Sequence, residues 1–184
     1  MGQRRVPYAS VAALLRRELV RGEGPETAAL MARLRPVKRR GSFTRAEFLS
    51  MCRWKSPRAI RHCEANSAAA VRRVSRAVLA TRSEQRRLEL LTGLRGVSVP
   101  TASAILTLVD PRRYGVLDIR AWQLLWRLGT VRRKPAGRGF GRDDWLEYLG
   151  EIRRHARRLG VRARSVELTL FLCHRRLQKG RLYA

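Results

Sequence analysis

One segment, from Leu91 to Trp122, constrains the fold of this chain more than any other. Its sequence is LTGLRGVSVPTASAILTLVDPRRYGVLDIRAW, and it contains a helix end, a short turn, a second helix and then an aspartate, Asp118, at the start of another helix. Gly96 permits a positive φ or a close backbone approach, and Pro100 fits the first turn of a helix. The segment therefore predicts two helices joined by a tight hairpin, with Asp118 at the start of the helix that follows them.

Helical periodicity dominates the rest of the chain, whereas the alternation typical of strands is nearly absent. Residues 36–41 (PVKRRG) are expected to form a basic linker and 134–141 a Pro/Gly-rich loop. A helix capped by Ser42 or Thr44 should run through Cys52. The other predicted helices span 10–21, 26–34, 58–65, 67–80, 83–91, 101–109, 118–128, 143–159 and a last segment that begins at Ser165. We therefore expect an all-α fold with about ten helices.

The charge of the chain predicts a polyanionic partner. Its 184 residues contain 41 Lys and Arg against 14 Asp and Glu, a formal net charge of +27, while 45% hydrophobic residues support a real core. Nearly all the basic residues are arginine, which a GC-rich genome would also favour, but codon usage does not explain the shortage of acids. Nucleic acid is the partner that this balance favours over a membrane surface.

Cysteine usage and hydropathy bear on cofactors and localisation. Cys52, Cys63 and Cys173 stand apart in the sequence, which is typical of a reducing compartment, and they are too few for a four-cysteine iron–sulfur cluster. The histidines lack a metal-ligand spacing. The first ten residues lack a signal-peptide apolar core, and no apolar run reaches the roughly 18 residues of a membrane helix. We expect a cytoplasmic, nucleoid-associated protein with no membrane partner.

The hairpin is expected to hold a phosphate backbone. Backbone N–H groups in a glycine-containing turn, and at the start of the helix that follows, can bind phosphate without reading base sequence. An ordinary corner between two helices has the same pattern, so the residues alone leave both interpretations open. The residues of this candidate anchor are Gly93, Leu94, Arg95, Gly96, Val97, Ser98, Val99, Pro100 and Thr101.

Asp118 is the candidate for chemistry. It is one of four aspartates and has apolar neighbours on both sides. A carboxylate in an apolar segment is costly unless it caps a helix, forms an ion pair or takes part in catalysis. An N-cap of the following helix, or an ion pair with Arg120 or Arg127, would explain it as well as catalysis does. Spacing alone does not choose between these roles.

The order of these elements resembles the core motif of the helix–hairpin–helix DNA glycosylase superfamily. That motif is L-x-G-V/I-G-x-x-x-A, an apolar helix and then V-x-D, and the resemblance extends over about 35 residues with small shifts in spacing. It implies two helical lobes with the active-site cleft between them, one of about 42–130 carrying the hairpin and Asp118, the other of 1–41 with 131–184. The matching residues are Gly96, Val97, Ala102, Ile105, Leu106, Val116 and Asp118.

The resemblance also implies a reaction. In this family the aspartate at the Asp118 position is essential for cleavage of the N-glycosidic bond. The hairpin holds the DNA backbone, often with Na⁺ or K⁺ at its carbonyls, which by position are those of Thr92, Leu94 and Val97. Bifunctional members carry a lysine where this chain has Pro100, so a monofunctional glycosylase without lyase activity is implied. The expected partner is double-stranded DNA, bound by a monomer without an iron–sulfur cluster.

The chemistry expected of such an enzyme follows from the inaccessibility of a stacked base. The nucleotide must be flipped out of the duplex, and a carboxylate beside the sugar can then stabilise an oxocarbenium-like transition state and position a water. Arg120 is the cation expected to support that charge. A non-catalytic DNA-binding protein and an enzyme that modifies DNA bases are the alternative functions. Candidates for the wedge or the base pocket, with packing and solvated charge as the alternative, are Trp54, Lys55, Ser56, Arg58, Tyr114, Arg120 and Trp122.

Overall fold

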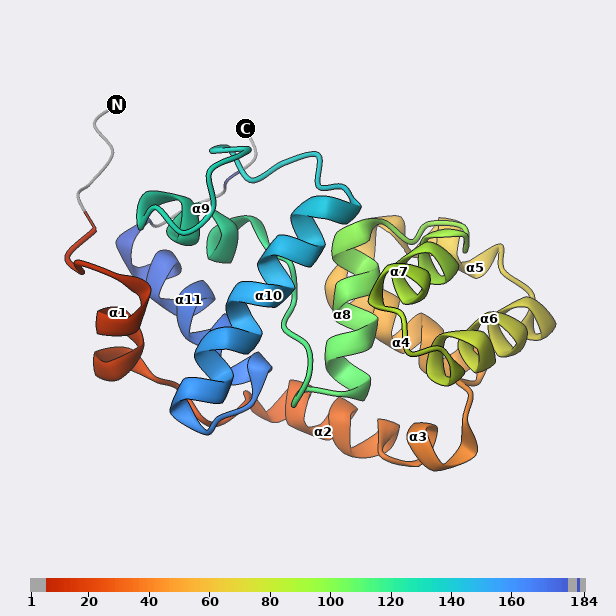
Figure 1. Cartoon of the computed structure of the whole chain (residues 1–184). Coiled ribbons are helices and arrows are strands. Elements are labelled where there is room, and N and C mark those ends of the chain that lie inside the picture. The colour runs from red at the N-terminus through yellow and green to blue at the C-terminus, as the bar shows by residue number, and fades with distance from the viewer. Residues whose placement is uncertain (1–5, 179–181, 183–184) are drawn as a thin grey trace. The chain divides into compact units, whose positions relative to one another are not determined.

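In the computed structural model, all regular secondary structure of the described residues is helical (Figure 1). It describes residues 6–178 and 182. Over these residues it contains eleven α-helices and one 3₁₀ helix, η1, with no strand, which confirms the expected all-α class. The chain folds as two compact units, a central unit of residues 23–111 and a terminal unit of residues 1–22 with 112–184.

The unit boundaries differ from the lobes of 42–130 and 1–41 with 131–184 that the family motif implies. The hairpin belongs to the central unit, whereas Asp118 belongs to the terminal unit. The segment before Asp118 is bonded there: the Ala163 N–H donates to the Arg112 carbonyl at 3.1 Å and the Val116 N–H to the Glu167 carboxylate at 3.2 Å. Periodicity locates helices, but it does not show which of them bonds to an irregular segment.

Helix α8 forms the core of the central unit. Nearly every residue of α8 is buried, and it packs against α2, α4 and α7. The predicted capping box is present, because the Thr44 side chain accepts from the Glu47 N–H and the Glu47 carboxylate accepts from the Thr44 N–H. The elements of this unit are α2 (Pro25–Leu34), α3 (Pro36–Arg40), α4 (Arg45–Lys55), η1 (Pro57–Ala59), α5 (Ile60–Glu64), α6 (Ala68–Ala80), α7 (Glu84–Thr92) and α8 (Val99–Val109).

Residues 36–41 are not the linker that the sequence suggested, because most of them form the short helix α3. Pro36 occupies its first turn, where a proline costs no hydrogen bond. Val37 is fully buried, so the segment is tied to the core. Gly41 ends the helix with a φ of 71° and donates to the Val37 carbonyl at 2.9 Å. The basic residues of this segment suggested a linker, but the buried side chain of Val37 anchors it to the core as helix α3.

Helix α11 is the centre of the terminal unit, where it packs against α1, α9 and α10. The largest fully buried side chains of this unit include Trp122, Trp145 and Tyr148. No described helix combines the length and apolar character needed to cross a membrane. The helices of this unit are α1 (Val11–Glu18), α9 (Ile119–Arg127), α10 (Arg142–Leu159) and α11 (Ala163–Leu177).

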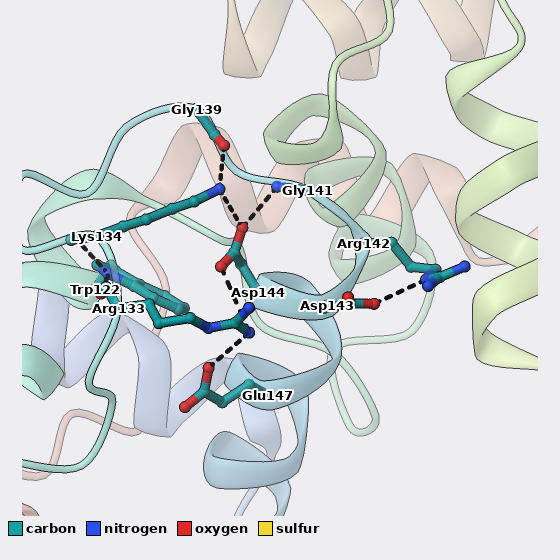
Figure 2. A network of polar contacts seen from close by, with 9 residues as sticks. All are labelled: Trp122, Arg133, Lys134, Gly139, Gly141, Arg142, Asp143, Asp144 and Glu147. Atoms are coloured by element: carbon teal, nitrogen blue, oxygen red, sulfur yellow. Dashed lines mark hydrogen bonds and ion pairs between the residues drawn. The ribbon is translucent and has the colours of Figure 1, made fainter.

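A buried carboxylate, that of Asp144, holds the loop between α9 and α10 (Figure 2). It accepts from the Gly141 N–H at 2.8 Å and from the Lys134 ammonium at 2.5 Å, and the Arg133 guanidinium lies 3.8 Å from its other oxygen. The Lys134 carbonyl accepts from the Trp122 indole N–H at 2.9 Å. The loop is therefore fastened both to the start of α10 and to a core residue of α9.

The pKa of Asp144 reflects these partners. Burial by itself would raise it, but the bonds from Gly141 and Lys134 and the charge of Arg133 outweigh burial, so the pKa lies below its ordinary value. Neighbouring Asp143 is exposed and pairs with Arg142 at 2.9 Å on the surface. Two adjacent acids at one helix start therefore have different structural roles.

We expect Asp144→Asn to lower the free energy of unfolding by about 2 kcal/mol, because two charge-assisted bonds to a buried carboxylate are lost. The matched variant Asp143→Asn should change it by less than about 0.5 kcal/mol, since its ion pair is solvated. Urea unfolding followed by tryptophan fluorescence measures both. A carboxylate whose pKa is lowered by folding stabilises the folded state at pH values above its unfolded pKa, about 3.9. As the pH falls below that value, the difference in the free energy of unfolding between the wild type and Asp144→Asn should therefore shrink. Equal effects of the two variants would contradict this role.

Candidate functional site

The hairpin between α7 and α8 is a tight turn of residues 93–98. The Leu94 N–H donates to the Leu91 carbonyl at 3.1 Å, and the Val97 N–H donates to the Leu94 carbonyl at 3.2 Å. Leu94 and Val97 are buried, whereas Arg95 and Ser98 are exposed. Two apolar side chains thus anchor the turn from within, and its polar residues face solvent.

Gly96 is required in this turn by both conformation and space. Its φ is 78°, in the left-handed region that favours glycine. A Cβ added there would lie 2.8 Å from the Cys63 nitrogen, and 2.9 Å from the Cys63 sulfur and the His62 Cβ. The hairpin therefore sits directly on α5. The Cys63 thiol also meets that of Cys52, so two cysteines that stand apart in sequence are neighbours, both as buried free thiols.

Asn66, two residues after the end of α5, fixes the backbone of the hairpin with its side chain. Its amide nitrogen donates to the Cys63 carbonyl at 2.8 Å and to the Arg95 carbonyl at 2.9 Å, while its amide oxygen accepts from the Arg95 N–H at 2.9 Å. Both backbone groups of Arg95 are thereby satisfied, and its side chain is left exposed. Sequence reasoning missed Asn66, because an asparagine before a helix cap suggests a local turn and nothing in it points to residue 95.

Three backbone N–H groups of the hairpin are open. Within the described part of the chain, the N–H groups of Gly96, Ser98 and Val99 have no hydrogen-bond acceptor. The Thr101 N–H, by contrast, is capped by the Ser98 hydroxyl at 3.4 Å. Because N–H groups at a helix start favour negative charge, this edge of the hairpin can hold a phosphate.

The carbonyls expected to bind a monovalent cation fit that task in kind, since Na⁺ and K⁺ accept rings of backbone oxygens. The Leu94 carbonyl already accepts one hydrogen bond from Val97, which leaves it a second lone pair. A cation at the carbonyls of Thr92, Leu94 and Val97 stays a prediction. Among the described residues, no group of three or more His, Cys, Asp or Glu is placed to hold a metal ion.

In the terminal unit, Asp118 is the N-cap of α9. Its carboxylate accepts from the Arg120 N–H at 2.9 Å, and its side chain is half-buried. This is one of the two structural roles that the sequence allowed. A carboxylate has about four lone-pair positions, so capping leaves Asp118 able to accept further bonds. The cap therefore fixes the orientation of the acid without excluding a chemical role.

Side chains from two helices fix the backbone that leads into Asp118. The Glu167 carboxylate of α11 accepts from the Val116 N–H at 3.2 Å, and the Tyr148 hydroxyl of α10 donates to the Val116 carbonyl at 2.7 Å. A Cβ at Gly115 would lie 2.7 Å from the Glu167 Cβ, so only glycine fits there. Sequence reasoning also missed Glu167, which has no local signal beyond being an acid on an otherwise apolar helix face.

The groups around Asp118 form a buried electrostatic cluster. Glu167 is fully buried and paired with Arg164. Burial raises the pKa of Glu167 against the opposing charge of Arg164, and the charge of Asp118 raises it further. Burial also raises the pKa of Tyr148 well above its ordinary value, with Glu167 and Asp118 adding to the effect. The Tyr148 hydroxyl therefore remains a donor to Val116 at any physiological pH.

His174 completes this cluster as a neutral residue. It is fully buried, and burial together with the charges of Arg127 and Arg120 lowers its pKa to about 4, while Asp118 opposes the shift. Its Nδ1 lies 3.4 Å from an Arg120 nitrogen, so the neutral ring can accept there. The same Arg120 nitrogen donates to the Gln178 carbonyl at 2.8 Å. Arg120, expected as the cation beside Asp118, thus also connects α9 with the end of α11.

The wedge candidates lie together at the end of α4. The Trp54 indole N–H donates to the Thr27 hydroxyl at 3.1 Å, and its ring is half-buried. Lys55 and Ser56 are half-exposed and Arg58 is exposed. Since His62 and Cys63, a few residues on, contact Gly96, this segment is in the same unit as the hairpin. Insertion of any of these side chains into DNA stays a prediction.

The aromatic pocket candidates pack in the core of the terminal unit. Tyr114 is 3% exposed, and its ring is stacked on that of Trp145 with 6.5 Å between centroids. Trp122 is fully buried, with its ring edge on Phe140 at 5.1 Å. A flipped base could stack on the ring of Tyr114 or of Trp122 only if that side chain moved out of its packed position.

Comparison with protein-family models, with curated proteins and with solved structures finds no match for the chain.

We expect Gly96→Ala to lower the free energy of unfolding by at least about 2 kcal/mol, because the left-handed φ and the contact with α5 both oppose a Cβ. Gly93→Ala is the matched control. Gly93 has an ordinary φ of −71°, and an added Cβ there would make only van der Waals contacts of 3.4 Å or more. Thermal and urea unfolding compare the two. A Gly96 variant as stable as the Gly93 variant would disprove the tight seat of the hairpin.

His174 should make stability depend on pH. Because its pKa is about 4 in the fold and about 6.5 when unfolded, the unfolded state takes up the proton first, and the free energy of unfolding falls between pH 6.5 and 4. The loss attributable to His174 is on the order of 3 kcal/mol. His174→Asn keeps an acceptor near Nδ1 but cannot take up that proton, so its stability should fall less. The raised pKa of Glu167 acts in the opposite sense in both proteins and cancels in the comparison. Urea midpoints from pH 4.5 to 7 that run parallel would refute this.

Proposed function

We propose that this protein is a DNA glycosylase of the helix–hairpin–helix type, which flips a damaged or modified base out of duplex DNA and hydrolyses its N-glycosidic bond without a lyase step. The observation that carries the proposal is the hairpin. Its Gly96 has a left-handed φ and is seated on α5, three of its N–H groups have no acceptor among the described residues, and the chain has a net charge of +27. The match of its residues to the glycosylase core motif, together with Asp118, supports the assignment of the chemistry.

DNA binding through this hairpin would be independent of base sequence. The open N–H groups of Gly96, Ser98 and Val99 suit a phosphate oxygen, which carries no sequence information. The exposed side chain of Arg95 can add a charge-assisted bond, and Asn66 holds the backbone of that residue rigid. Because neutralised phosphates release counterions, affinity should fall steeply with salt.

The proposed reaction is a hydrolysis in which Asp118 stabilises the developing charge on the sugar. The bond between C1′ and the base nitrogen breaks, water forms the new C1′–O bond, and its proton leaves with the base or to solvent. The N-cap bond orients the carboxylate, and the fixing of Val116 by Glu167 and Tyr148 keeps its position preorganised. Pro100 offers no amine in the hairpin's exit turn, which supports base removal without strand cleavage.

One observation favours a second function, that of a non-catalytic DNA-binding protein. Tyr114 and Trp122 are buried in packed positions, and the capping of α9 is by itself a sufficient role for Asp118. Such a protein would use the hairpin and the arginines alone. An enzyme that modifies bases without removing them is the further alternative, and product analysis distinguishes the three.

The decisive experiment incubates the protein with duplexes that carry uracil, an alkylated base or an oxidised base, and reveals abasic sites by alkali. We expect abasic sites in otherwise intact strands from the wild type. Asp118→Asn should reduce excision by about 100-fold or more while DNA affinity changes by less than about twofold, because asparagine is an equally good N-cap without the charge. Asp143→Asn, which alters an exposed acid of the same unit, should excise normally.

Each contrary result has its own meaning. Excision by Asp118→Asn at the wild-type rate would remove Asp118 from the mechanism. Salt-dependent binding of all duplexes with no product, and unaffected by Asp118→Asn, would identify a binding protein. A changed base mass by mass spectrometry without base release would identify a base-modifying enzyme.

A further inference from the structure

The terminal unit contains a pocket that the proposed glycosylase chemistry does not use. Its volume is about 510 Å³, within the range of small-molecule sites, roughly 300–1,000 Å³. Three of its six lining residues are arginines and none is acidic. The lining residues are Arg21, Arg112, Gly160, Val161, Arg162 and Ser165.

The three arginines come from separate segments that converge on the start of α11. Arg162 is the N-cap of that helix. The Arg112 carbonyl accepts from the Ala163 N–H at 3.1 Å, which ties its segment to the first turn. Arg21 follows Val20, whose N–H donates to the Thr169 hydroxyl of α11 at 2.9 Å. The convergence is therefore fixed by the backbone bonds of all three segments, independently of where the long side chains extend.

None of these three guanidinium groups has a counter-ion in the fold. Among the described residues, Arg21, Arg112 and Arg162 have no carboxylate partner and no hydrogen-bond acceptor. Elsewhere in this unit the scarce acids are shared with other arginines, as Glu167 is with Arg164 and Glu18 with Arg176. Like charges gathered without a counter-ion repel one another, and an anion bound among them would relieve that repulsion.

Ser165 is the one uncharged polar residue among those that line the pocket. The residue is only 6% exposed, it lines the pocket, and no described residue bonds to its hydroxyl. A serine hydroxyl at a pocket wall that bonds to no described residue is available to donate a hydrogen bond to a ligand oxygen. A hydroxyl beside guanidinium groups is a common combination for binding phosphate.

The helix termini at the pocket act in the same direction. Helix α11 has 15 residues and places its positive end here. At the end of α10, two carbonyls accept hydrogen bonds in the cap: the Gly160 N–H donates to Arg157 at 3.3 Å and the Val161 N–H to Ala156 at 3.0 Å. The three guanidinium groups and the N-terminus of α11 therefore both favour an anion in the pocket.

We propose that this pocket is a phosphate-binding site, separate from the hairpin, in which Arg112 and Arg162 grip the phosphate oxygens, Arg21 adds charge and the Ser165 hydroxyl donates a hydrogen bond. Guanidinium groups match phosphate with paired hydrogen bonds. The phosphate belongs either to the backbone of bound DNA, where each phosphodiester carries one negative charge, or to a free phosphate monoester, which is largely dianionic at neutral pH. Both present phosphoryl oxygens that guanidinium groups can bind. The site does not depend on any catalytic role of Asp118.

The test is calorimetric titration of the whole protein with inorganic phosphate and pyrophosphate at low salt, with chloride as the reference anion. The double variant Arg112→Gln/Arg162→Gln should bind phosphate at least about tenfold more weakly, since each charge-assisted contact is worth that much. The matched control is Arg73→Gln/Arg132→Gln, which removes the same charge from two exposed arginines outside the pocket and should bind as the wild type does. Circular dichroism and thermal unfolding check that all variants fold.

Ser165→Ala distinguishes a built site from charge alone. Loss of the hydroxyl leaves the net charge unchanged, yet it should weaken phosphate binding severalfold. Duplex DNA titrated at several salt concentrations identifies the source: a smaller salt slope for Arg112→Gln/Arg162→Gln than for the control pair assigns the site to the DNA backbone. An unchanged slope with lost phosphate binding assigns it to a free phosphate ester. Equal phosphate affinity of the two double variants, or wild-type binding no tighter than that of chloride, would overturn the proposal.

Discussion

The hydrogen bond from the Val116 N–H to the buried Glu167 carboxylate is the interaction on which the candidate chemistry depends. It ties the segment after the second hairpin helix to α11, and together with the bond from Tyr148 it satisfies both backbone groups of Val116, two residues before Asp118. The chain has only 14 acids, so buried acids are few. Asp144 likewise holds the loop before α10 by accepting from the Gly141 N–H. Both acids bind a backbone N–H and a cation at once, which compensates for burying a charge.

The basic residues have the converse distribution. Several near an acid are held in ion pairs, as Arg164 and Lys134 are, while many others in the described part of the chain are exposed and give the surface a positive field. The hairpin adds a different kind of positive site, because its open N–H groups carry only partial charge but are rigidly placed by Gly96 and Asn66. Diffuse charge can attract DNA from a distance, whereas rigid donors fix the position of one phosphate.

Local sequence signals predicted most of the helices and turns. The features that they did not predict depend on contacts between residues far apart in the sequence. The spacing of Thr44 and Glu47 predicted the capping box, and Gly96 with Pro100 predicted the hairpin, because caps and turns depend on residues only a few positions apart. Helix α3 was missed since a single buried side chain, Val37, outweighs its basic neighbours. Asn66 and Glu167 were missed for a related reason: their partners lie 29 and 51 residues away, and no spacing rule connects them.

The N-cap geometry of Asp118 bears on whether capping excludes a further role for its carboxylate. Capping and catalysis first stood as competing explanations, yet the cap uses only part of the capacity of the carboxylate. Serine, threonine or asparagine would cap α9 about as well and without charge. The charge of Asp118 raises the pKa of Glu167, and it opposes the lowering of the His174 pKa by Arg127 and Arg120. Capping therefore accounts for the position and orientation of the acid, while its charge acts on Glu167 and His174 as well. The proposed catalytic role would be an additional use of the same charge.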